Sequence, residues 1–166
     1  MTRLSLLKAS TTILFTFGII LLFFLFPLII VIAVFPERIP ATLMEDIEQP
    51  ITSLDIVLLF TLSVGFALLV YALYLFRRIL YLFKHKQIFH NDVIKNFDYM
   101  GKVIISGYLL MAISSPEDFF YVDDKFNILM VFVFSSAFLG AGLFLLVLAK
   151  VFKMAKDIKE ENDLTV

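Results

Sequence analysis

Three long apolar runs without a single charged residue constrain this chain more than any other feature. They cover residues 9–35, 56–76 and 128–149. A helix that crosses the roughly 30 Å hydrocarbon core of a bilayer needs about 20 apolar residues, and each run reaches that length. Hydrophobic residues make up 61% of the chain, whereas a soluble domain contains about 45–50%. The sequence therefore predicts a membrane protein with three clear spans.

A fourth helix is predicted between the second and third of these runs. Its uncharged part, residues 103–115, is too short to cross a membrane by itself at about 1.5 Å per residue. However, Asn91 is a good N-cap, and Asp92 suits a first helical turn, where the helix dipole favours negative charge. Lys102 can extend its charged end back to the membrane surface. We expect one helix over about residues 92–115, half on the membrane and half in it; the alternative is a re-entrant segment.

The predicted fold is an all-α, four-helix integral membrane bundle that forms a single domain over residues 1–166. The expected helices cover about residues 9–35, 56–84, 92–115 and 128–158. Loops 36–55 and 116–127 are acidic and are expected on the outer side, whereas loop 77–102 is basic and is expected on the inner side.

The distribution of lysine and arginine sets the predicted orientation. All 14 Lys and Arg residues except Arg38 and Lys125 fall in the two terminal segments or in loop 77–102. Short segments rich in these residues stay in the cytoplasm. We therefore expect both termini and loop 77–102 to be cytoplasmic, in a multi-pass protein of the bacterial plasma membrane.

Reactive side chains are scarce in the sequence. The uncharged helix cores contain no ionisable residue, which argues against a proton-coupled transporter or an intramembrane metalloprotease. The chain has no cysteine and two histidines, His85 and His90, whose spacing does not put them on one helical face. We expect a non-enzyme with no catalytic, cofactor-binding or metal-binding residue. The net charge of −1 predicts no direct binding of nucleic acid, and the basic loop suits the lipid bilayer as its partner.

Small residues in the last apolar run form two pairs with small-xxx-small spacing. Ser136 pairs with Gly140, and Ala137 pairs with Ala141. Such pairs let helix backbones approach closely in lipid. We expect these four residues to pack helices together.

The end of the chain is predicted to leave the membrane as a helix along its surface. Val151, Phe152, Ala155 and Ile158 fall on one helical stripe, and charged residues occupy the rest. An amphipathic pattern of this kind suits the membrane interface. Residues 160–166 are then expected to form a short extended end, where a partner can dock.

Two short motifs resemble those of a known family. Ile88 and Phe89 follow a basic turn, and the predicted helix after them reaches Gly101. Near the end of the chain, Phe152 and a lysine precede Glu-Asn-Asp-Leu-Thr-Val at residues 161–166. These features and the four-helix layout resemble the bacterial four-helix membrane proteins called domain of unknown function, family twenty-nine seventy-five.

The resemblance implies a partner rather than a reaction. The family has no established catalytic residues, and its genes often neighbour a small Cro-type helix-turn-helix regulator. A membrane partner for such a regulator is implied by analogy at the level of the fold. Lys86 and Ala155 stand where glycine is common in the family, so the local geometry there departs from its pattern. The residues expected to contact the regulator are Ile88, Phe89, Asp163, Leu164, Thr165 and Val166.

Two classes of function stay open at this point, and an enzyme has the least support. The first class is a non-enzymatic regulatory membrane protein that binds a small cytoplasmic helix-turn-helix transcription regulator. The alternative is a small transport or toxic-peptide immunity component, motivated by patches of serine and glycine in the helices that face the acidic outer loops 36–55 and 116–127. This alternative requires a homo-oligomer, because four helices are few for a transport path.

A reporter that works only in the cytoplasm tests the predicted topology. We expect the reporter to be active when it is fused after Lys8, within residues 84–95 or after Val166. We expect it to be inactive when it is fused within residues 40–50 or 118–125. Moving one positive charge outward against the membrane potential costs about 2.3 kcal/mol per 100 mV, so the basic segments should stay inside. Activity of the fusion within 118–125 would show that the third helix does not cross the membrane.

Overall fold

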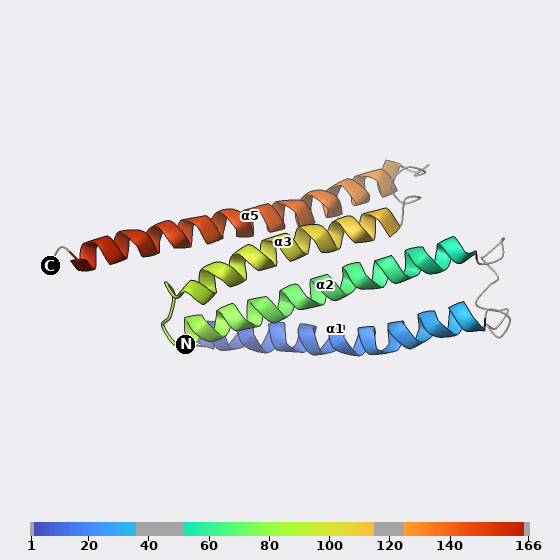
Figure 1. Ribbon diagram of the computed structural model, residues 1–166, viewed down its shortest axis with the longest axis horizontal. Coiled ribbons are helices and arrows are strands. Elements are labelled where there is room, and N and C mark those ends of the chain that lie inside the picture. The colour runs from blue at the N-terminus through green and yellow to red at the C-terminus, as the bar shows by residue number, and fades with distance from the viewer. Residues whose placement is uncertain (1, 36–51, 115–124, 165–166) are drawn as a thin grey trace.

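The computed structural model describes residues 2–35, 52–114 and 125–164, and it contains four long helices (Figure 1). The helices are α1 (Thr2–Val34), α2 (Ser53–Lys84), α3 (Asn91–Ser114) and α5 (Lys125–Leu164). No strand occurs in the described ranges. The prediction of an all-α, four-helix fold is therefore confirmed.

Three of these helices contain segments long and apolar enough to cross a membrane. The segments are Ser5–Val34, Ser53–Lys84 and Phe132–Leu164. Their outer faces expose large apolar side chains, such as Phe23 at 72% and Phe132 at 70%. Water solvates such a surface poorly, whereas lipid is a good solvent for it. The chain is thus an integral membrane protein.

α3 combines an apolar face with charged residues in its first half. Its inner face buries Val93, Phe97 and Met100, whereas Asp98 and Lys102 are partly or largely exposed and form an ion pair at 2.6 Å. This amphipathic pattern lowers the mean hydropathy of the helix but leaves its inner face apolar. One unbroken helix is present, as predicted, and it runs antiparallel between α2 and α5 (Figure 1).

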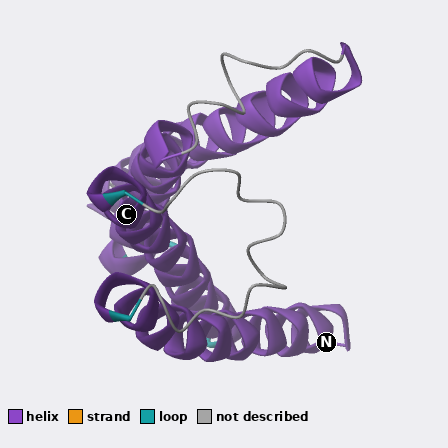
Figure 2. Ribbon diagram, turned by 90° about the vertical axis from the view of Figure 1, so that its right-hand side faces the viewer, coloured by secondary structure: helices purple, strands orange, loops and turns teal. Residues whose placement is uncertain are grey.

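The helices pack in chain order and form an open arc. In the described residues, α1 packs on α2, α2 on α3, and α3 on α5, and no other pair of helices is in close contact. Seen along the helices, this row curves and leaves a concave face open (Figure 2). Neighbouring helices alternate in direction, so the start of α1, the turn at residues 85–90 and the end of α5 all lie at the same end of the molecule (Figure 1). We call this end of the molecule the turn end.

Helices α1 and α2 begin earlier than the sequence predicted. α1 begins at Thr2 instead of residue 9, because the residues before the apolar run continue the helix. α2 begins at Ser53, behind a capping box that the prediction missed. The Thr52 hydroxyl accepts from the Asp55 N–H at 3.4 Å, and the Thr52 N–H donates to the Asp55 carboxylate at 2.7 Å. These bonds satisfy N–H groups that a helix start leaves unpaired.

Helix α5 continues beyond its predicted end. It reaches Leu164, so the expected end near residue 158 and the extended segment from residue 160 are wrong within the described residues. Lys156 and Glu160 form an ion pair at 3.1 Å one turn apart, and pairs with this spacing support a helix. Thr165 and Val166 lie outside the described residues.

The hydrophobic core lies near the turn end, between α2, α3 and α5. Ile79 and Val93 are fully enclosed, with 0% of their surface exposed, and Leu75 and Phe97 are nearly so. Ala149 of α5 belongs to the same cluster. This core anchors the first half of α3, the part whose outer face is charged.

Glycines bring α3 against both of its neighbours with backbone facing backbone. A Cβ atom added at Gly65 of α2 would lie 2.9 Å from the carbonyl oxygen of Gly107 in α3. A Cβ atom added at Gly101 of α3 would lie 2.7 Å from the carbonyl oxygen of Gly142 in α5. Neither distance leaves room for a side chain. Because lipid is as apolar as a leucine side chain, helices in a membrane associate through such close packing.

The small residues that were predicted to pack α5 occupy a different face. Ser136, Ala137, Gly140 and Ala141 are exposed, and a Cβ atom added at Gly140 would meet nothing within 4 Å in the described structure. Gly142 makes the close contact with α3 instead. The small-xxx-small pairs therefore do not hold α5 against α3 in the described residues.

Replacing Gly142 should destabilise the protein. The Cβ atom of Gly142→Val would lie 2.5 Å from the Ile105 side chain, and overpacking of this kind costs about 1–3 kcal/mol. Gly140→Val is the matched control, because it places the same side chain in open space on the same helix. Unfolding in mixed micelles of a mild detergent and dodecyl sulfate measures both variants. An equal loss of stability in the two would contradict the proposed role of the glycine contact.

Candidate functional site

A tight turn at residues 85–90 ends α2 and leads the chain into α3. The Lys86 N–H donates to the carbonyl oxygen of Phe83 at 3.1 Å, and the Gln87 N–H donates to that of Leu82 at 3.1 Å. This Schellman arrangement satisfies the last carbonyl groups of a helix. Lys86 has the left-handed conformation that the motif requires, with φ of 59°. A non-glycine residue in this conformation lowers the stability of the fold by about 1–2 kcal/mol. The turn forms in spite of this local strain.

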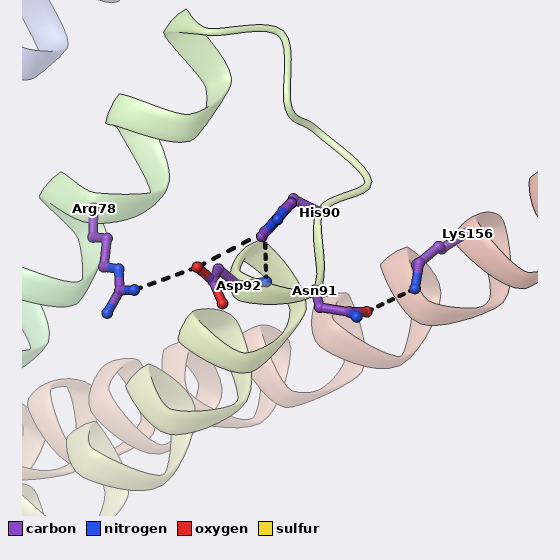
Figure 3. A network of polar contacts seen from close by, with 5 residues as sticks. All are labelled: Arg78, His90, Asn91, Asp92 and Lys156. Carbon is purple, nitrogen blue, oxygen red and sulfur yellow. Dashed lines mark hydrogen bonds and ion pairs between the residues drawn. The ribbon is translucent and has the colours of Figure 1, made fainter.

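Polar contacts tie three helices together beside this turn (Figure 3). Arg78 of α2 forms an ion pair with Asp92 of α3 at 3.3 Å, and Lys156 of α5 donates to Asn91 Oδ1 at 2.8 Å. His90 Nδ1 lies 3.8 Å from the Asp92 carboxylate. Exposed ion pairs contribute about 0–1 kcal/mol each. Their effect is therefore mainly to fix how the helix ends are oriented.

Asn91 is not the N-cap that the sequence predicted. It is the first residue of α3, and its side chain bonds across to Lys156 of α5. His90 precedes the helix, and its Nδ1 accepts from the Asp92 N–H at 3.2 Å, a role that requires this ring nitrogen to be unprotonated. Asp92 lies in the first turn, as predicted.

An aromatic cluster packs the turn against α5. The Phe152 ring of α5 lies 6.1 Å from Phe83, 6.5 Å from Phe89 and 5.4 Å from Phe97, measured between ring centroids. Lys159, two turns further along α5, places its Nζ 5.7 Å from the centroid of the Phe89 ring. Contacts of aromatic rings with each other and with cations stabilise such a cluster. The turn is thus attached to α5 through Phe89.

Of the two segments predicted to bind a partner, the turn contacts α5 through Phe89 at Phe152 and Lys159, and Asp163 and Leu164 follow further along the same helix. Ile88 and Phe89 keep 41% and 39% of their surface exposed. Further along α5, Asp163 is exposed and Leu164 keeps 87% of its surface exposed. The remaining predicted residues, 165–166, lie outside the described part of the chain.

The apolar stripe predicted for the end of α5 is divided between two faces. Phe152 and Ala155 are half-buried, whereas Val151 and Ile158 keep 47% and 66% of their surface exposed. Met154, which the prediction did not include, is 57% exposed. One face of α5 thus holds the turn, and another presents apolar side chains at helical spacing.

The chemistry of the turn end suits noncovalent binding. Exposed apolar side chains there lie beside charged groups of both signs, so apolar contacts and charge complementarity are both open to a partner. In the described residues, no group of three or more His, Asp or Glu side chains could hold a metal ion.

Shortening Phe152 should detach the turn from α5. Phe152→Ala removes the ring that contacts Phe89, and truncation of a packed phenylalanine costs about 3–5 kcal/mol in a full core and less at this half-buried position. Hydrogen exchange at the Gln87 amide should accelerate by about tenfold or more. Met154→Ala is the control, because that side chain is exposed. Equal protection of Gln87 in both variants would show that the ring does not hold the turn.

The comparisons with known proteins give a family without an assigned reaction. No curated protein and no solved structure matches the chain. One family model, described as a protein of unknown function (DUF2975), matches residues 38–166. The match includes α2, α3 and α5 and therefore the whole polar network of the turn end. Since it spans most of the sequence, the chain belongs to the DUF2975 family.

Proposed function

We propose that this chain is a non-enzymatic regulatory membrane protein that binds a small cytoplasmic helix-turn-helix transcription regulator at its turn end. The observation that carries the proposal is the contact of Phe89 with Phe152 and Lys159, which joins the turn and the end of α5 into one exposed surface. A surface held by three helices loses less entropy on binding than a free tail, so it can bind a partner more tightly.

The charge distribution supports a cytoplasmic position for this surface. Lys84 ends α2, Lys86 lies in the turn, and the lysines of residues 150–159 follow on α5 at the same end (Figure 1). Segments rich in lysine and arginine stay in the cytoplasm. The proposal therefore includes cytoplasmic termini and a multi-pass location in the bacterial plasma membrane.

The last turns of α5 add negative charge to the surface. Lys156 contacts the first residue of α3, so residues 157–164 extend beyond α3 (Figure 1). Asp157, Glu161 and Asp163 are exposed on this extension. Helix-turn-helix proteins bind the phosphate backbone of DNA through basic side chains. A negative surface complements such a protein, and a regulator held through its basic face would be kept from DNA.

A small transport or toxic-peptide immunity component that acts as a homo-oligomer is a second proposal. It is favoured by the exposed small residues of α5, since the open space at Gly140 lets another helix approach closely. A chain that stays monomeric in mild detergent would speak against this second proposal and leave the first one intact.

Binding of the regulator tests the first proposal. The full-length chain, purified from membranes in mild detergent, should retain a small helix-turn-helix regulator of the kind that the family resemblance implies. Combining Glu161→Lys with Asp163→Lys reverses the negative charge of the extension and should weaken binding by about tenfold, because attraction becomes repulsion. In cells, the same double variant should release the regulator and change transcription from the promoter that the regulator binds.

Lys95→Glu is the control for this experiment. It also reverses a charge near the turn end, but on the exposed face of α3 rather than on the extension. Binding should be unchanged in this variant. Absence of binding by the unmodified chain, together with unchanged transcription after its deletion, would refute the proposal.

A further inference from the structure

An apolar cavity of about 530 Å³ opens on the concave side of the helix row. Leu14, Gly18 and Leu21 of α1 line one side, and Phe66 and Phe76 of α2 lie among the residues of the other side. Side chains of α3 and Phe138 of α5 complete it. Ligand pockets in proteins have volumes of about 300–1,000 Å³, so the cavity is large enough for a ligand.

The position of the cavity determines which chemistry it can hold. Most of its lining residues belong to the segments Ser5–Val34 and Ser53–Lys84, which are long and apolar enough to cross a membrane. Every lining side chain is apolar. A polar group inside would lose its hydrogen bonds to water and find no partner, at a cost of several kcal/mol. A hydrocarbon chain fits such a lining, and a surrounding membrane supplies acyl chains.

Two cations lie toward the turn end of the same α1–α2 contact. The Arg77 guanidinium carbon is 4.8 Å from the ring centroid of Phe15, directly beside the cavity residues Leu14 and Phe76. Lys8 Nζ is 5.9 Å from the ring centroid of Tyr81, closer to the turn end. Among the described ion pairs, neither Arg77 nor Lys8 has a carboxylate partner. Both are available to an anionic headgroup.

We propose that this cavity binds an acyl chain of an anionic phospholipid of the surrounding membrane, with its phosphate against Lys8 and Arg77. The inference requires only that α1 and α2 span the membrane, and it is independent of the binding of a regulator. An acyl chain alone gains little by leaving other lipid, because its surroundings are equally apolar. Selection must therefore come from the headgroup, through the two cations.

The absence of tryptophan from the chain provides a clean test. Phe138→Trp places one fluorophore in the cavity, and Phe144→Trp places one on the outer surface of α5, where Phe144 is 63% exposed. Each variant is reconstituted in phosphatidylcholine vesicles with a minor fraction of lipid brominated on its acyl chains. The brominated lipid is either phosphatidylglycerol or phosphatidylcholine. The ratio of quenching by these two lipids at one position is independent of the depth of the fluorophore.

In the cavity, brominated phosphatidylglycerol should quench about fivefold more effectively than brominated phosphatidylcholine, as expected for attraction by nearby cations. On the outer surface, the two lipids should quench equally. Phe66→Trp repeats the measurement from α2 if Phe138→Trp does not fold. Equal quenching by the two lipids in the cavity would overturn the proposal.

Removing the cations tests the headgroup site directly. Combining Lys8→Gln with Arg77→Gln should abolish the preference for phosphatidylglycerol in the cavity. The matched control combines Lys86→Gln with Lys95→Gln, which removes the same charge from exposed positions in the turn and on α3. This control should keep the preference. A preference that falls equally in both double variants would show general attraction of anionic lipid to the turn end, and the proposed site would be wrong.

Discussion

The contact of α3 with the backbones of both its neighbours supports most other features of the structure. α3 is the least apolar of the four helices. The transfer of a separate α3 from water into lipid would therefore be the least favourable of the four. Gly65 and Gly107 bring it against α2, and Gly101 and Gly142 bring it against α5. The core around Phe97 then fills the space between the three helices at the turn end. Without this contact, α5 would lose the only helix on which it packs in the described residues.

The same packing creates the surface at the turn end. Because α3 lies between α2 and α5, the turn that precedes α3 is held close to the C-terminal half of α5. There the ring of Phe89 packs against the ring of Phe152. Lys156 and Asn91 fix the start of α3 on α5. α5 continues beyond this point as a charged helix (Figure 1). The chain thus offers a firmly held patch beside a projecting helix, which suits the capture of a small folded partner.

The order of packing also explains the open concave face. Since α1 packs on α2 alone in the described residues, no helix closes the row on its other side. The cavity results from this geometry, and its walls are apolar because they come from segments that must be compatible with lipid. The exposed small residues around Gly140 show that a second close contact of α5 is sterically open. The lipid and protein partners proposed above would therefore meet different parts of the same row.

The sequence alone determined that the chain is helical and lies in a membrane, because runs without charge leave no other way to satisfy the backbone in lipid. It also located the turn motif at Ile88 and Phe89 and the charged end of α5, since these depend on local composition. The periodicity of the sequence does not say which small residues touch a neighbouring helix or which face of α5 contacts the turn, and only the tertiary structure decided both. In the structure, Gly142 and not Gly140 makes the close contact of α5 with α3. Both features depend on the relative rotation of helices distant in sequence, and that rotation is set by packing.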